Sequence, residues 1–189
     1  MKKNDIPVFS TDIHGHVVFI RRTCSSTPPL CEIKINMINQ NQIIALIPKA
    51  TVWSQQQERE ILKDGIPLSI SQLEDARKVS VKNPGKVRLL CVNQIPLPKD
   101  HELKSANQLL NLITPETIGL TCQYGIFIRR DHWNNRETIA HELVHVSQYE
   151  RFGNTQGFLS RYIPECISPG YPNGPLEQEA RNKARSITT

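Results

Sequence analysis

The sequence has few of the features that mark secreted, membrane-spanning or cysteine-zinc proteins. No C-x-x-C pair occurs, which argues against a cysteine-based zinc knuckle. No run approaches the ~18 apolar residues that a membrane span needs. Two lysines follow Met1, but the apolar segment of a signal peptide does not come after them. We therefore expect no membrane span and a cytoplasmic location, with export by a route lacking a cleaved signal as the alternative.

The cysteines give no disulfide framework either. They are odd in number and widely spaced, at Cys24, Cys31, Cys91, Cys122 and Cys166. Cys24 and Cys31 could pair in a secreted protein, but nothing else in the sequence requires a bridge. We expect most of the thiols to be reduced and partly buried. With 189 residues, the chain can bury roughly 70% of its extended surface without disulfides.

The basic residues form no nucleic-acid-binding pattern. The net charge is +5 and the pI is about 9.0, but segments 1–35, 36–112 and 113–189 carry +2, +3 and 0. Aromatic residues make up only 6% of the chain, and no tight Lys/Arg run contains them. We expect no nucleic-acid partner, and binding of DNA or RNA through the basic first half stays a third-ranked hypothesis.

One motif stands out in the C-terminal part. The stretch "TIAHELVHVSQYERFG" contains the H-E-x-x-H pattern, from His141 to His145. On a helix, these two histidines lie one turn apart on one face. Asn134 is expected to cap this helix, and Gly153 is expected to follow its end. The neighbours that suggest burial on both sides of the histidine face are Ile139, Ala140, Leu143, Val144 and Val146.

Because this helix is expected to be buried, its polar side chains require an explanation. Two histidines and a glutamate in an apolar setting are costly unless a partner satisfies them. A zinc ion would do so, whereas the simpler alternative is two core histidines hydrogen-bonded to neighbours. A catalytic zinc site needs three protein ligands. The metzincin pattern is excluded, because Gln148 and Arg151 stand where it requires glycine and histidine.

The third ligand is expected on the last helix, which opens at Pro175. Leu176, Ala180 and Ala184 form an apolar stripe, and Glu177 borders it. Glu179 lies about 200° further round the helix, toward solvent. We expect Glu177 to be the ligand, with Glu165 as its rival. The remaining histidines are His132, which could face the site from the entry loop, and His14, His16 and His101, which have no supporting pattern.

H-E-x-x-H followed by E-x-x-A on a later helix resembles the gluzincins, zinc peptidases with two His ligands and one Glu ligand. The wider pattern "AHELVHVSQYERFG…FLSRYI…GYPNGPLEQEA" is also similar to a family of small bacterial proteins with predicted metallopeptidase domains. The resemblance covers about residues 115–185. It implies that residues 119–130 form a strand that pairs with the substrate backbone. Many gluzincins have Asp four residues after the ligand Glu, where this chain has Arg181.

The expected function is therefore zinc-dependent, endopeptidase-like hydrolysis of a peptide or protein substrate. His141, His145 and Glu177 would hold Zn2+, and Glu142 would act as general base on the attacking water. The expected oxyanion donors are Tyr171 and His132, whereas Tyr149 and Tyr162 are expected to be packing residues. The alternative is a non-enzymatic, zinc-stabilised interaction module, in which a fourth protein ligand would close the site.

The fold class expected is α+β, with a small mixed or antiparallel sheet, an active-site helix and a C-terminal ligand helix, as in zincins. We expect an N-terminal β-rich arm or hairpin over 1–50, a helical and strand region over 51–112, and a zincin-like metallopeptidase core over 113–189. The expected strands are 17–20, 31–35, 86–92 and 118–130, the last bent or turned at Gly125. The expected helices are 51–64, one from Ser71 capped with Glu74, 101–113, the motif helix to about Phe152, 156–163, and one from Pro175.

Overall fold

The computed structural model describes residues 8–11, 17–20 and 40–189. The chain divides into two compact units, Met1–Asn36 and Met37–Thr189. In the first unit, β1 (Val8–Thr11) pairs antiparallel with β2 (Val17–Ile20). The strand expected at 17–20 is confirmed, and its partner is β1. The other features predicted for this part lie outside the described residues, namely the strand at 31–35, His14, His16, Cys24 and Cys31.

The second unit contains a four-stranded mixed sheet, which confirms the α+β class. Its strand order is β3-β4-β6-β5. β4 and β6 run parallel, whereas β3 and β5 are antiparallel to their neighbours. β5 therefore lies at one edge of the sheet. The strands are β3 (Ile66–Pro67), β4 (Arg88–Val92), β5 (Gly119–Cys122) and β6 (Gly125–Arg129).

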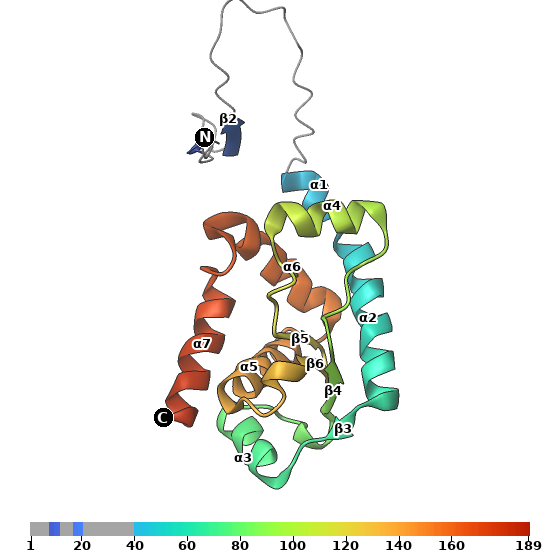
Figure 1. Cartoon of the computed structure of the whole chain (residues 1–189), viewed down its shortest axis with the longest axis vertical. Coiled ribbons are helices and arrows are strands. Elements are labelled where there is room, and N and C mark those ends of the chain that lie inside the picture. The colour runs from blue at the N-terminus through green and yellow to red at the C-terminus, as the bar shows by residue number, and fades with distance from the viewer. Residues whose placement is uncertain (1–7, 12–16, 21–39) are drawn as a thin grey trace, which may run out of the picture. The chain divides into compact units, whose positions relative to one another are not determined.

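Helices cover both faces of this sheet, and Figure 1 shows the sheet between α2 and α5. Alternate residues of β6 point to opposite faces. Phe127 packs with Ile61 of α2, while Ile126 and Ile128 pack with Leu143 and its neighbours on α5. The helices are α1 (Gln40–Ala45), α2 (Ile47–Asp64), α3 (Ile70–Lys78), α4 (His101–Leu110), α5 (Arg136–Arg151), α6 (Thr155–Glu165) and α7 (Pro175–Thr188). Short helical segments are η1 (Pro84–Lys86), η2 (Arg130–His132) and η3 (Cys166–Gly170).

Several element boundaries differ from the sequence-based expectation. The helix expected from Thr51 begins at Ile47, because Pro48 fits its first turn. α3 is capped at Ser69 rather than Ser71. The Ser69 hydroxyl accepts a hydrogen bond from the Gln72 N–H, and the Gln72 side chain accepts one from the Ser69 N–H. Ser69 thus provides the capping box, two residues before the expected position.

The strand expected over 118–130 is a hairpin. β5 and β6 are joined by a tight turn in which Gln123 has a φ of 54°. Gly125, expected to mark a bulge or a turn, therefore opens β6 directly after that turn. No helix among the described residues is both long and apolar enough to cross a membrane.

Candidate metal centre and its cleft

α5 presents the histidine motif from a buried position. Asn135, rather than Asn134, caps the helix, because the Asn135 side chain accepts a hydrogen bond from the Thr138 N–H at 2.9 Å. The helix ends at Arg151 as expected, and Gly153 follows with a φ of 88°, a conformation that favours glycine. The flanking positions expected to be apolar core are buried, namely Ile139, Ala140, Leu143, Val144 and Val146.

α7 brings Glu177 against the motif. Its apolar stripe is buried at Leu176, Ala180 and Ala184, and the small alanines let α7 lie close to α5. Glu165, the rival third ligand, has a different role. Its Oε2 accepts a hydrogen bond from the Leu176 N–H at 2.9 Å and so caps the first turn of α7.

Three ligand atoms meet where α5 and α7 face each other. The Nε2 atoms of His141 and His145 are 3.1 Å apart, and each lies 3.4 Å from an oxygen of Glu177. Two ligands of a tetrahedral zinc, each about 2.0–2.1 Å from the ion, stand about 3.3 Å apart. The contacts within this triangle of residues, which reach Oε2 of Glu177 from His141 and Oε1 from His145, are therefore of the size that a zinc ion requires. Within the described part of the chain, these three form the one such group of His, Cys, Asp or Glu.

The charges of this group are strongly coupled. Burial alone would raise the pKa of Glu177, but hydrogen bonds and charges of His141 and His145 lower it well below its usual range. Burial alone would lower the pKa of His145, but Glu177 raises it to about 9. Without a metal, the cluster thus holds a proton on His145 and a negative charge on Glu177.

Gln148 fixes the orientation of His145. The Gln148 side-chain amide donates to the Leu176 carbonyl at 3.0 Å and to Glu179 Oε2 at 3.1 Å. Both of those partners are acceptors, so the Gln148 oxygen is the atom 2.8 Å from His145 Nδ1, and Nδ1 must donate to it. In a neutral ring, His145 Nε2 then carries a lone pair that points at the other two ligands. This tautomer is the one that binds metal through Nε2.

Two further contacts hold the ligand carboxylate and its surroundings. The Tyr162 hydroxyl donates to Glu177 Oε1 at 2.6 Å. Tyr162, expected to be a packing residue, therefore also binds the candidate ligand Glu177. Glu179, expected to face solvent, pairs with Lys183 at 2.8 Å and also with Arg151 at 2.7 Å. Glu179 thereby anchors the Gln148 amide from behind.

Glu142 lies beside the triangle, with its side chain directed at β5. It is 6% exposed, and its Oε2 accepts a hydrogen bond from the Thr121 hydroxyl at 2.7 Å. A Cβ at Gly119 would overlap the other oxygen, Glu142 Oε1. Glycine at this position therefore leaves the space in which the carboxylate sits. One oxygen is held by Thr121, and the other is available to a proton or a ligand.

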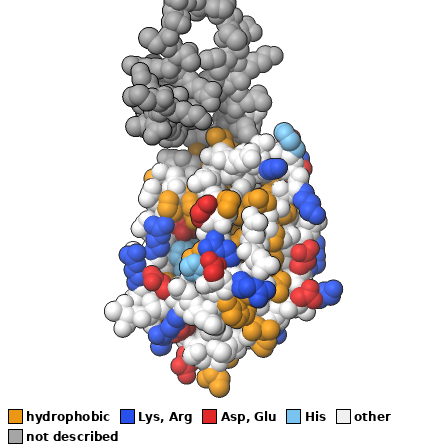
Figure 2. Space-filling model, viewed as in Figure 1, with side chains coloured by type: hydrophobic (Ala, Val, Ile, Leu, Met, Phe, Trp, Pro, Cys, Tyr) orange, Lys and Arg blue, Asp and Glu red, His pale blue; other side chains and the backbone are white. Residues whose placement is uncertain are grey.

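The site opens into a cleft of about 440 Å³. His132, Tyr171 and Arg181, the three other residues singled out by the sequence, line this cleft together with His141, Glu142 and Glu177. Figure 2 shows histidine side chains on this face among both acidic and basic groups. Burial raises the pKa of Tyr171 to about 12, with Glu177 and Glu142 acting in the same direction. Tyr171 thus keeps its proton and can donate it in a hydrogen bond.

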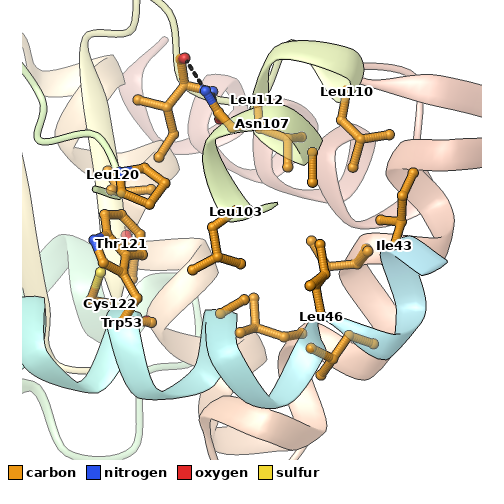
Figure 3. A pocket seen from close by; sticks show the side chains of 18 of the residues that line it. Ile43, Leu46, Trp53, Leu103, Asn107, Leu110, Leu112, Leu120, Thr121 and Cys122 are labelled. Carbon is orange, nitrogen blue, oxygen red and sulfur yellow. Dashed lines mark hydrogen bonds between the residues drawn. The ribbon is translucent and has the colours of Figure 1, made fainter. Parts of the chain in front are cut away.

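A second, apolar cavity of about 130 Å³ lies on the other side of β5. Figure 3 shows Ile43, Leu46 and Leu103 converging on it from α1, the α1–α2 junction and α4. Tyr149 borders this cavity, stacks on Phe158 and donates its hydroxyl to the Thr121 carbonyl at 3.2 Å. Tyr149 is therefore a packing residue, as expected from the sequence.

Gln148, Thr121 and Gly119 were not identified from the sequence. Gln148 could have been found, because it follows His145 by three residues and so shares its helix face. Thr121 and Gly119 carry no such local pattern, since they reach Glu142 through tertiary packing. No protein-family profile, curated protein or solved structure matches the chain.

Proposed function

We propose that the chain is a zinc-dependent peptidase in which His141, His145 and Glu177 hold the metal and Glu142 is the general base. The observation that carries this proposal is the cluster in which the two Nε2 atoms lie 3.1 Å apart and each lies 3.4 Å from a different oxygen of Glu177. Its donor set of two imidazoles and one carboxylate suits zinc. Its hydrogen bonds with Gln148 and Tyr162 are the kind that orient metal ligands.

The competing explanation for the close approach of His145 and Glu177 is an ion pair without metal, in which His145 carries a proton. A buried ion pair of this kind would be expensive as a purely structural device. Here the second histidine belongs to the same cluster, so that one possible ligand atom from each of the three residues lies within 4.8 Å of the others. No fourth His, Cys, Asp or Glu within residues 40–189 joins the group. This supports an open coordination position, and so an enzyme rather than a closed structural site.

The residues around the triangle have assignable roles. A zinc ion in such a site acts as a Lewis acid and lowers the pKa of water toward neutrality. Glu142 Oε1, free of the Thr121 hydrogen bond, accepts the proton of the attacking water. Tyr171 and His132 line the same cleft and are the donors available to the developing oxyanion.

The sheet supplies a place for the substrate. β5 is an edge strand that runs beside α5 and ends in the cleft at Gly119. An extended peptide could add to this edge through its backbone at the Gly119 end, because the Tyr149 hydroxyl occupies the Thr121 carbonyl further along. This arrangement supports a zincin-like, endopeptidase-like enzyme, because the backbone rather than one chain end would be bound.

The decisive comparison is between the wild type and Glu142→Gln, both stripped by a chelator and reloaded with zinc. We expect one zinc per chain in each by metal analysis. In a mixture of peptides followed by mass spectrometry, we expect the wild type to cleave and Glu142→Gln to be at least about 100-fold slower. Equal rates would contradict the role of Glu142, and a zinc-loaded wild type that cleaves nothing would contradict the function.

A further inference from the structure

Arg181 is an unpaired cation on the wall of the cleft. It lies one turn after Glu177 on α7 and is half-buried. The other two basic residues of this helix, Lys183 and Arg185, each have a carboxylate partner, at 2.8 and 3.6 Å. Arg181 has no ion pair or hydrogen bond with any residue in the described ranges, and it lines the cleft. The five N–H donors of its guanidinium have no acceptor among the described protein groups and are open to solvent.

Arg181 is not needed to orient the metal ligands. Gln148 holds His145, and Tyr162 holds Glu177. Arg181 lowers the pKa of Tyr171 against the larger effect of burial, and both side chains line the cleft. The guanidinium therefore faces the space that a substrate would occupy.

The charge balance of the site also leaves Arg181 uncompensated. A bound zinc ion carries two positive charges, which the carboxylates of Glu142 and Glu177 offset. Tyr171 is neutral, because its pKa is about 12. Glu116 and Glu137 border the cleft but are exposed, so solvent and salt screen them. The net excess near the reacting centre is the positive charge of Arg181.

We propose that Arg181 binds a carboxylate of the substrate next to the bond that is cleaved. Residues four apart on a helix have Cβ atoms about 5–6 Å apart, so the guanidinium reaches within one or two substrate residues of the centre. Its planar fork matches a carboxylate in two parallel hydrogen bonds. The carboxylate belongs either to an Asp or Glu side chain or to the free C-terminus of a short peptide. This proposal rests on the proposed peptidase function.

The test compares matched peptides in the wild type, Arg181→Ala and Arg185→Ala. Cleavage sites found in a peptide mixture are resynthesised with Glu or Gln, and Asp or Asn, at each position beside the scissile bond. The same peptides are made with free and with amidated C-termini, which separates the two sources of carboxylate. Arg185→Ala removes an equal charge from the same helix and is the control, because Arg185 lies outside the cleft lining and its partner Glu137 is exposed and screened by solvent.

We expect the wild type and Arg185→Ala to prefer one acidic peptide over its amide by about tenfold to a hundredfold in kcat/KM. Arg181→Ala should bring that ratio near one, and Arg181→Glu should favour Lys at the same position. Zinc content and circular dichroism check that each variant is folded. Cleavage that is lost in Glu142→Gln but shows the same acid preference in Arg181→Ala would overturn this proposal alone. Absence of any cleavage by the zinc-loaded wild type would instead overturn the peptidase function on which it rests.

Discussion

The polar cleft and the apolar cavity lie on either side of β5 and are stabilised in opposite ways. In the cleft, two of the three candidate ligands are held by specific hydrogen-bond partners, Gln148 for His145 and Tyr162 for Glu177. The cavity is lined almost entirely by carbon atoms, and apolar packing forms most of its walls, with a hydrogen bond of Asn107 at one side. Thr121 belongs to both, since it borders the cavity and donates to Glu142.

Because of this contrast, substitutions in the two regions should affect different properties of the protein. Burial of apolar surface stabilises the cavity walls, so truncation there should reduce the free energy of unfolding. The cleft residues are expensive to bury and are balanced by hydrogen bonds or by a metal, so changes there should act on zinc binding and catalysis. Variants on the two sides of β5 can therefore test whether stability and function are carried by different residues.

The largest effect is expected from Glu177→Gln in the cleft. About 10–16 kcal/mol of zinc binding is typically spread over four ligands, so loss of one should weaken affinity on the order of 100- to 1000-fold. Glu165→Gln is the matched control, because Glu165 caps α7 and pairs with Arg161 at 2.9 Å. It should keep zinc and lose about 1 kcal/mol of stability. Competition with a chromophoric chelator measures the zinc affinity of both variants, and denaturant unfolding measures their stability. Equal zinc affinities would remove Glu177 from the ligand set.

Leu103→Ala probes the cavity. Leu103 lines the cavity and is 9% exposed. We expect this truncation to cost about 2–4 kcal/mol of unfolding free energy through lost burial and an enlarged void. Zinc affinity, measured in parallel, should stay within a factor of two or three of the wild type. Loss of zinc binding in the folded variant would show that the two regions are not separable.

Gln148→Ala should weaken zinc binding by about 10- to 100-fold, the usual effect of removing a hydrogen bond to a ligating histidine. Gln156→Ala, at an exposed position of α6, is the control. Titration calorimetry measures both affinities. An unchanged affinity in Gln148→Ala would mean that this amide does not select the His145 tautomer.

The smallest effect, about tenfold for each pH unit, is expected for the pH dependence of zinc binding. The pKa of His145 in the metal-free protein is about 9, above its ordinary value of 6.5. The contribution of protonated His145 to the free energy of unfolding of the metal-free protein is fully present below pH 6.5. It is lost as the pH rises through about 9. Zinc must displace the proton, so affinity should fall about tenfold per pH unit below pH 9. Calorimetry at pH 7.5 in buffers of different protonation enthalpy should report about one proton released, and zero release would contradict the assignment.

Local patterns predicted much of the fold and part of the site. The end of α5 before Gly153 and the start of α7 at Pro175 follow from capping and proline preferences, which act within one helical turn. The alanines at 180 and 184 indicated which face of α7 is buried, and thereby singled out Glu177. The caps at Ser69 and Asn135 were misplaced by one or two residues, because neighbouring polar residues offer competing caps.

The partners of the site depend on tertiary contacts and had no local pattern. Tyr162 reaches Glu177 because α6 turns back before α7, and Thr121 reaches Glu142 because β5 lies against α5. Neither arrangement is encoded by a sequence spacing. Arg181 in place of the aspartate of many gluzincins suggested a missing orienting group. The structure supplies that group at Gln148, from the motif helix itself.

The most direct test is a crystal structure of the zinc-loaded protein, with anomalous data collected on both sides of the zinc absorption edge. We expect one zinc peak per chain, about 2.0–2.2 Å from Nε2 of His141, Nε2 of His145 and a Glu177 oxygen. Glu142 should remain outside the coordination sphere, with an open position facing the cleft. Absence of a peak from this triangle would contradict the proposed zinc site, and a fourth protein ligand closing it would contradict the proposed peptidase function.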